Sequence, residues 1–232
     1  MKNLLAIFVL ALMFTACGET TPTDTNTSNT ANQGHRYAIE AGTIEYELTG
    51  DWIGTQTIYF DDWGNLQADH MEMTMEMFGV TQDVNEANIL KDGIMYTLDL
   101  NARTGTKMSS EVLNETLTQD SEVTAEMITE ELMESFGGTK TGTDEIAGKT
   151  CDVWEIESLF TTTCLWNSIA LKTTASMAGI EMESIAVKIE EKSPSADKFE
   201  IPEDIEITED PFTEEYDMGM EEYREMQGLP IE

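Results

Sequence analysis

The sequence is poor in basic side chains and contains only two histidines. Twelve lysines and arginines stand against 46 aspartates and glutamates, which gives a formal net charge of −34. A surface of this sign repels nucleic acid and anionic membranes, so we expect no nucleic-acid partner. The two imidazoles are His35 and His70, and no common hydrolase, zinc-protease or phosphate-loop motif occurs. These absences favour a non-catalytic protein without a cofactor or a resident metal.

Cysteine is also scarce, because the chain contains only three. In an exported protein an odd number leaves one thiol with a separate role. Cys151 and Cys164 are symmetric about residues 157 and 158, in a stretch rich in β-branched and aromatic residues. A hairpin centred there would place the two cysteines face to face across an antiparallel pair. We therefore predict a structural disulfide, since a redox pair would more often have Cys-x-x-Cys spacing.

No apolar run is long enough to span a bilayer comfortably. Residues 1–16 have one lysine, a short apolar run and then small residues, which predicts a secretory signal peptide. The stretch Phe14-Thr15-Ala16-Cys17 resembles the lipobox of bacterial lipoproteins, and that resemblance implies lipidation of Cys17. An ordinary signal peptide is the alternative. Gly18 stands where an aspartate resembles an inner-membrane retention signal, which favours the outer membrane of a Gram-negative envelope, on its periplasmic or surface side.

The segments that flank the domain lack large apolar residues or are strongly acidic. Residues 17–35 contain the lipidated cysteine and then a polar stretch, which cannot bury enough surface to fold and so predicts a disordered tether. Residues 208–232 form an acidic C-terminal tail. Between them we expect one β-rich domain over residues 36–207, in a protein that is a monomer.

Alternating patterns predict an antiparallel meander in the first half of the domain. One long strand over residues 37–48 with a bulge near Gly42 is followed by strands over 52–60, 66–78, 81–90 and 94–100. Residues 70–77 alternate four methionines with His70 and three other polar residues, so in a strand the thioethers share one side. The pattern is typical of a half-buried apolar face. Two functional readings stay open, namely a soft-metal site for Cu(I) with His70 beside it and an adaptable surface for acyl chains.

A helix is expected after the meander. Ser121 is a suitable N-cap, apolar residues follow at spacings of three and four as far as Phe136, and Gly137-Gly138 ends the pattern. The single apolar stripe of residues 122–136 requires a partner surface, so we predict that this helix lies on the sheet.

Taken together, these elements resemble the outer-membrane lipoprotein-carrier superfamily (LolA-like and LppX-like). The phrases that carry the resemblance are Gly148-Lys149-Thr150-Cys151-Asp152-Val153-Trp154, Leu165-Trp166 and Phe199-Glu200-Ile201-Pro202. The resemblance implies an α+β fold, namely a strongly curved antiparallel sheet, or half-barrel, with one or two helices across its concave face. It also implies a cavity for a lipid or an acyl chain, whereas the lipid anchor of this chain resembles tethered members more than a soluble shuttle.

The expected cavity lining combines the methionine strand with apolar residues of later elements. It comprises Met71, Met73, Met75, Met77, Tyr96, Leu98, Ile128, Leu132 and Trp154. A closed core would instead indicate a structural or interaction lipoprotein, and Met-rich copper binding remains a further alternative.

Overall fold

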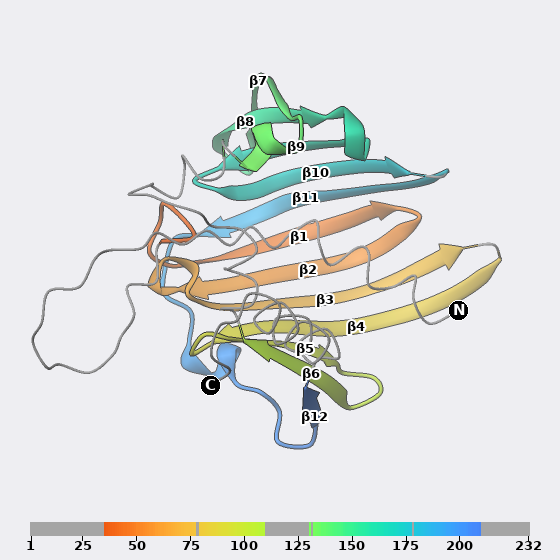
Figure 1. The fold of residues 1–232 in the computed structure, drawn as a ribbon, viewed down its shortest axis with the longest axis vertical. Helices are drawn as coiled ribbons and strands as arrows, with labels where there is room; N and C mark the ends of the chain where they lie inside the picture. The colour runs from red at the N-terminus through yellow and green to blue at the C-terminus, as the bar shows by residue number, and fades with distance from the viewer. Residues whose placement is uncertain (1–34, 78, 110–129, 131, 178, 210–232) are drawn as a thin grey trace, which may run out of the picture.

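One continuous β-sheet organises the computed structural model, which describes residues 35–77, 79–109, 130, 132–177 and 179–209. The strands within these residues follow the spatial order β12-β6-β5-β4-β3-β2-β1-β11-β10-β9-β8-β7 (Figure 1). Every neighbouring pair is antiparallel except β12 and β6. The strands are β1 (Gly42–Gly50), β2 (Trp52–Asp61), β3 (Leu66–Met77), β4 (Val80–Lys91), β5 (Ile94–Asp99), β6 (Thr104–Ser109), β7 (Thr139–Ile146), β8 (Lys149–Ile156), β9 (Thr161–Trp166), β10 (Ile169–Met177), β11 (Ile180–Glu190) and β12 (Glu206–Glu209).

The expectation of a large antiparallel sheet is confirmed, and the described residues contain very little helix. Within the described ranges there are three short 3₁₀ turns, η3 (Asp62–Gly64), η4 (Glu157–Leu159) and η5 (Ala196–Phe199). Residues 130 and 132–135 are α-helical, whereas most of the helix expected over 122–136 lies outside the described residues. The expected signal peptide, lipidated Cys17, tether and most of the acidic tail lie outside them as well. No helix in the described ranges is long and apolar enough to cross a membrane.

The last helical turn ends as the glycine pair predicts. Gly137 has a φ of +77°, its N–H donates to the carbonyl of Glu134, and the N–H of Gly138 donates to the carbonyl of Met133. This pair of hydrogen bonds is a Schellman motif. The buried side chain of the turn is Met133, whereas Phe136 is 43% exposed. The expected apolar stripe through Leu132 and Phe136 was therefore wrong by one residue, because Met133 is the side chain that packs on the sheet.

The strands β2 to β5 match the alternating pattern closely, and the methionine run lies within β3. The tight turn between β4 and β5 has positive φ at both Asp92 and Gly93, as a two-residue hairpin requires. The first strand was predicted too long, since β1 begins at Gly42 and residues 37–41 precede it. The register irregularity lies between Glu45 and Tyr46, where β11 rather than β1 contributes the extra residue.

Three strands have no alternating apolar pattern in their sequences, namely β6, β7 and β12. Their sequences are polar, and seven of the eight residues of β7 are exposed. β6 pairs with β5 on one side and with β12 on the other, although β12 follows it by about a hundred residues of sequence. Pairing with a neighbour, rather than a buried apolar face, therefore defines these strands.

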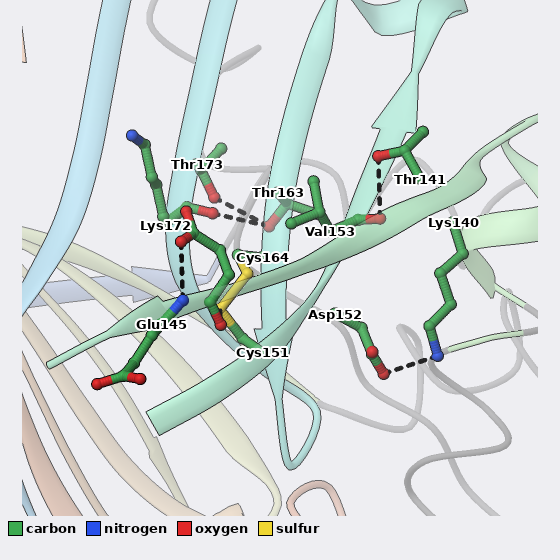
Figure 2. The surroundings of a disulfide bond; sticks show 11 residues. Lys140, Thr141, Glu145, Cys151, Asp152, Val153, Thr163, Cys164, Lys172 and Thr173 are labelled. Atoms are coloured by element: carbon green, nitrogen blue, oxygen red, sulfur yellow. Dashed lines mark hydrogen bonds and ion pairs between the residues drawn. A yellow bond between two sulfur atoms is a disulfide. The ribbon is translucent and has the colours of Figure 1, made fainter. Parts of the chain in front are cut away.

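The predicted disulfide is confirmed, although its register differs from the symmetric arrangement. Cys151 and Cys164 are bonded with their Cα atoms 5.4 Å apart (Figure 2). The residue directly opposite Cys164 is Val153, so the bond runs diagonally across β8 and β9. The turn is centred on Ser158 and Leu159, one residue later than expected, because η4 occupies it.

We expect removal of the disulfide by the double change Cys151→Ser and Cys164→Ser to lower the free energy of unfolding by about 3 kcal/mol. The bond restricts the unfolded chain, so reduction of the unmodified protein should produce the same loss. Urea unfolding of the variant, of the reduced protein and of the oxidised protein would measure both effects. Equal stability of all three would contradict a structural role.

Candidate functional site

The strand register assigns each side chain to one of two faces of the sheet. One transverse row of directly paired residues runs from β8 to β4: Trp154, Thr163, Thr173, Ser184, Leu48, Gly54, Met73 and Val84. Directly paired residues point to the same side of a sheet. We call the side of this row, which also includes Met71 and Met75 by alternation, the methionine face.

The methionine face buries two of the four methionines that were expected to line a cavity. Met73 and Met75 are buried with Leu48 and Val84, and Met71 packs at the margin of this cluster. On β8, Trp154 is buried with Met133, Ile156 and Leu165, so the end of the helix rests on the same face. Leu132 is half-buried, whereas Ile128 and the side chain of Met77 lie outside the described residues.

Two residues of the expected lining lie on the opposite face. The β4–β5 register pairs Leu98 with Ala87 and Tyr96 with Ile89, whose parity is opposite to that of Val84. Leu98 is fully buried in a separate cluster that Phe199 of η5 and Ile205 cover. The prediction that Tyr96 and Leu98 share a cavity with the methionines was therefore wrong. Alternation defines two faces for β3 and two for β5, but no feature of the sequence relates the faces of one strand to those of the other.

His70 also lies away from the methionines. Alternation along β3 places its side chain on the opposite face, where it packs edge-on against Tyr59 with ring centroids 5.7 Å apart. Burial lowers the pKa of His70. No group of three or more histidine, cysteine or carboxylate side chains among the described residues could hold a metal ion. The expectation that His70 sits beside the thioethers was therefore wrong.

An open pocket of about 870 Å³ lies at the end of the sheet where β8 turns into β9 and β10 into β11. Two neighbouring transverse rows bound it. The row on the methionine face comprises Ile156, Thr161, Ala175, Met182 and Gly50, and the other row comprises Glu155, Thr162, Thr174, Glu183 and Thr49. Phe160, which is 65% exposed, lies at its rim. The methionine face therefore supplies the apolar part of a pocket within the usual size range of ligand sites.

A polar cluster interrupts the methionine face at the end of β3 away from this pocket. Asp69 is 7% exposed, and the side-chain amide of Gln56 donates to both of its oxygens, at 3.0 Å to Oδ1 and 2.8 Å to Oδ2. Burial raises the pKa of Asp69 from 3.8 to about 7, the bonds from Gln56 oppose that rise, and the nearby Glu86 adds to it. Asn88 is directly opposite Asp69 on β4. This cluster was not predicted, although Asp69 falls in the same phase as Met71 and Met73, and that mismatch was a visible signal.

No family model matches the sequence, and no curated protein matches it. The fold overlaps in part with an uncharacterized conserved protein from Thermus thermophilus, with a TM-score of 0.46 and 6% identity over 74% of this chain and 91% of that one. It also overlaps with LprF from Mycobacterium bovis, with a TM-score of 0.29 and 10% identity over 64% and 84% of the two chains. At these scores neither likeness assigns a family or a function, so function must be argued from the geometry of this chain.

The buried acid makes a testable contribution to stability. The pKa of Asp69 is raised in the folded state, so its contribution to the free energy of unfolding is largest below pH 3.8. This contribution is lost as the pH rises through 7, and the total loss is about 4 kcal/mol. We expect Asp69→Asn to be more stable than the unchanged protein by a few kcal/mol at pH 8 and by about 1.5 kcal/mol at pH 5. Urea unfolding at both pH values would measure the difference.

The matched control is Asp83→Asn, which removes an exposed carboxylate on β4 that accepts a hydrogen bond from Thr74. It changes the net charge by the same amount without touching the buried cluster. An equal pH-dependent gain in this control would attribute the effect to net charge and contradict the role of Asp69.

Proposed function

We propose that this protein is a lipid-anchored component of the cell envelope that binds an apolar ligand, a lipid or an acyl chain, on the methionine face without catalysing a reaction. The observation that carries the proposal is the open pocket of about 870 Å³, whose apolar side continues the row of Met75 and Trp52. A pocket of this size accommodates a drug-sized or acyl-chain ligand.

The side chains of this face suit hydrocarbon of variable shape. Methionine is unbranched and polarizable, so it adapts to irregular apolar partners. An acyl chain that removes about 300 Å² of apolar surface from water gains about 7 kcal/mol before the cost of association. Met73 and Met75 on β3 and Trp154 on β8 supply apolar side chains on one face. The expected half-barrel, with a helix across its concave face, would suit the same use. Met133 packs against Trp154, so the end of the helix predicted over 122–136 lies on the methionine face.

The membrane partner is proposed from the N-terminal sequence. Lipidation of Cys17 would hold the domain at the outer membrane, since several acyl chains give stable attachment whereas one is marginal. The tether up to residue 35 would allow the domain to stand off from the headgroups, because a flexible chain of this length spans about 20 Å. Periplasmic and surface placement both fit this arrangement.

A structural or interaction lipoprotein with a filled core is the second candidate function. The acidic surface favours it, since a net charge of −34 could select basic partners. The open pocket favours ligand binding over this candidate. The copper alternative is not retained, because His70 and the thioethers point to opposite faces and alternate thioethers on a strand are about 7 Å apart.

Two adjacent residues of β10 give a matched test of the ligand site. Ala175 points to the methionine face and Thr174 to the opposite face, and both border the pocket. We expect Ala175→Trp to occlude the apolar side and to lower the amount of co-purified lipid at least about tenfold, whereas Thr174→Trp leaves it within about twofold. Native mass spectrometry of the gently extracted mature protein would measure the bound lipid.

The reverse pattern would place the ligand on the opposite face. Absence of lipid from the unchanged protein, with no uptake of an added acyl-chain probe, would favour the filled-core lipoprotein instead.

The anchor is tested separately through its cysteine. We expect Cys17→Ala to abolish incorporation of labelled palmitate and to release the protein from the membrane fraction, because the apolar chains are lost. Cys151→Ser with Cys164→Ser is the control, since it removes two cysteines but leaves the lipobox intact. Membrane retention of the Cys17→Ala protein would contradict lipid anchoring.

A further inference from the structure

We propose that the buried cluster of Asp69, Gln56 and Asn88 recognises the head of the bound ligand, and that this ligand is an amphiphile with an ammonium group. The inference rests on the proposed binding of an apolar ligand to the methionine face and names the chemical class of that ligand. It is carried by three side chains on three strands, β2, β3 and β4, that the register directs to one side of the sheet.

The carboxylate of Asp69 has hydrogen-bond acceptor positions left unused. Asp69 accepts one hydrogen bond from the Gln56 amide at each oxygen, at 3.0 Å and 2.8 Å. A carboxylate has about four acceptor positions, so two remain for another donor. Gln56 is 2% exposed and holds the carboxylate in place, because its own side chain is almost completely buried.

An unpaired acceptor lies beside the carboxylate of Asp69. Asn88 is 8% exposed, directly opposite Asp69, and its Oδ1 atom is buried without a hydrogen-bond partner within the described part of the chain. Buried polar atoms are almost always paired in folded proteins, so an orphaned one calls for a partner. Asp69 and Asn88 together present acceptors, and the group that completes them must donate hydrogen bonds.

The charge of the buried carboxylate favours a cationic head group. Burial disfavours the ionised form of Asp69, and its pKa rises to about 7. An ammonium group within hydrogen-bond distance would offset that cost, whereas a carboxylate or phosphate head would add a second negative charge. Glu86, half-buried one step further along β4, reinforces this selection, and its pKa is raised by burial and then by Asp99. The net charge of −34 attracts the same class of ligand.

The position of the cluster also fits an amphiphile. On β3, Met71, Met73 and Met75 follow Asp69 on the same face. The six residue steps of strand from Asp69 to Met75 span about 20 Å. Met75 lies in the transverse row that continues through Trp52 and Gly50 to the open pocket. A head at Asp69 would therefore place the hydrocarbon chain along the methionines, on the same side of the sheet as the apolar row of the pocket.

The titratable groups around Asp69 are Tyr37, Tyr46 and Glu86, and Asp69 itself has a pKa of about 7. Tyr37 and Tyr46 contact the region from the start of the domain and from β1, and burial raises the pKa of both. Arg36 stays charged and donates to the carbonyl of Gly64. Glu86 on β4 adds a negative charge that strengthens as the pH rises. Affinity for an amine should therefore increase with pH through the range in which Asp69 ionises.

The test compares three probes with one chain length and different heads: decylamine, decanol and decanoate. Each is titrated calorimetrically into the mature lipidated protein at a fixed concentration of non-ionic detergent, with empty detergent as the blank. We expect decylamine to bind at least about tenfold more tightly than decanol at pH 8, and decanoate to bind most weakly. Between pH 6 and pH 8 the affinity for decylamine should rise about tenfold, because the ionised fraction of Asp69 increases by that factor.

Variants separate the head from the chain. Asp69→Asn should lower the decylamine affinity about tenfold and leave decanol within about twofold, and Asn88→Leu should also weaken decylamine. Asp83→Asn, on the opposite face of β4, is the matched control and should bind all three probes as the unchanged protein does. Equal affinities for the three heads, tightest binding of decanoate, or an unaltered Asp69→Asn would overturn the inference while leaving apolar binding intact. Failure of all three probes to bind would instead overturn the proposed function.

Discussion

The alternation of side chains along a single hydrogen-bonded sheet decides which residues of this protein meet on each face. Leu48, Gly54 and Met73 are directly paired, so the phase of β3 is fixed relative to that of β1. The same ladder continues through β11 to Trp154 on β8. A slip of one residue between any two strands would invert every side chain beyond it. The methionine face therefore exists only because the register is unbroken along this row, since the irregularities of β11 and β10 lie outside it.

Small residues occupy the middle of the methionine face. The transverse row has bulky side chains at its two ends, whereas Thr163, Thr173, Ser184 and Gly54 lie between them with Leu48. At Gly54 an added Cβ would lie 2.1 Å from the carbonyl oxygen of Glu72, so β2 and β3 approach too closely there for any side chain. Thr163, Thr173 and Ser184 are themselves buried, so small polar side chains fill the middle of the row where its two ends have large apolar ones.

The sequence predicted elements whose signal is local and missed those defined by distant partners. Strands β2 to β5 alternate clearly, and Asp92-Gly93 specifies its own turn. The cysteine pair was also found, but not its diagonal register, because η4 shifts the turn. β12 is a strand through its pairing with β6, a contact between distant segments that no local pattern contains. The prediction for the face of Tyr96 was wrong for the same reason. Periodicity separates the two faces of a strand, but it does not indicate which of them is shared with the methionines of β3.

Asp69 shows how a local conflict can indicate function. Four methionines follow it in the same phase of β3, so an apolar residue at this position would suit folding better than a buried acid. Asn88 adds a second cost, because its Oδ1 atom is buried without a partner within the described residues. Natural proteins accept such conflicts mainly at functional sites, where a ligand supplies the missing interaction. Asp69 and Asn88 lie directly opposite each other on adjacent strands, so the ammonium head of the proposed amphiphile would complete the hydrogen bonding of both.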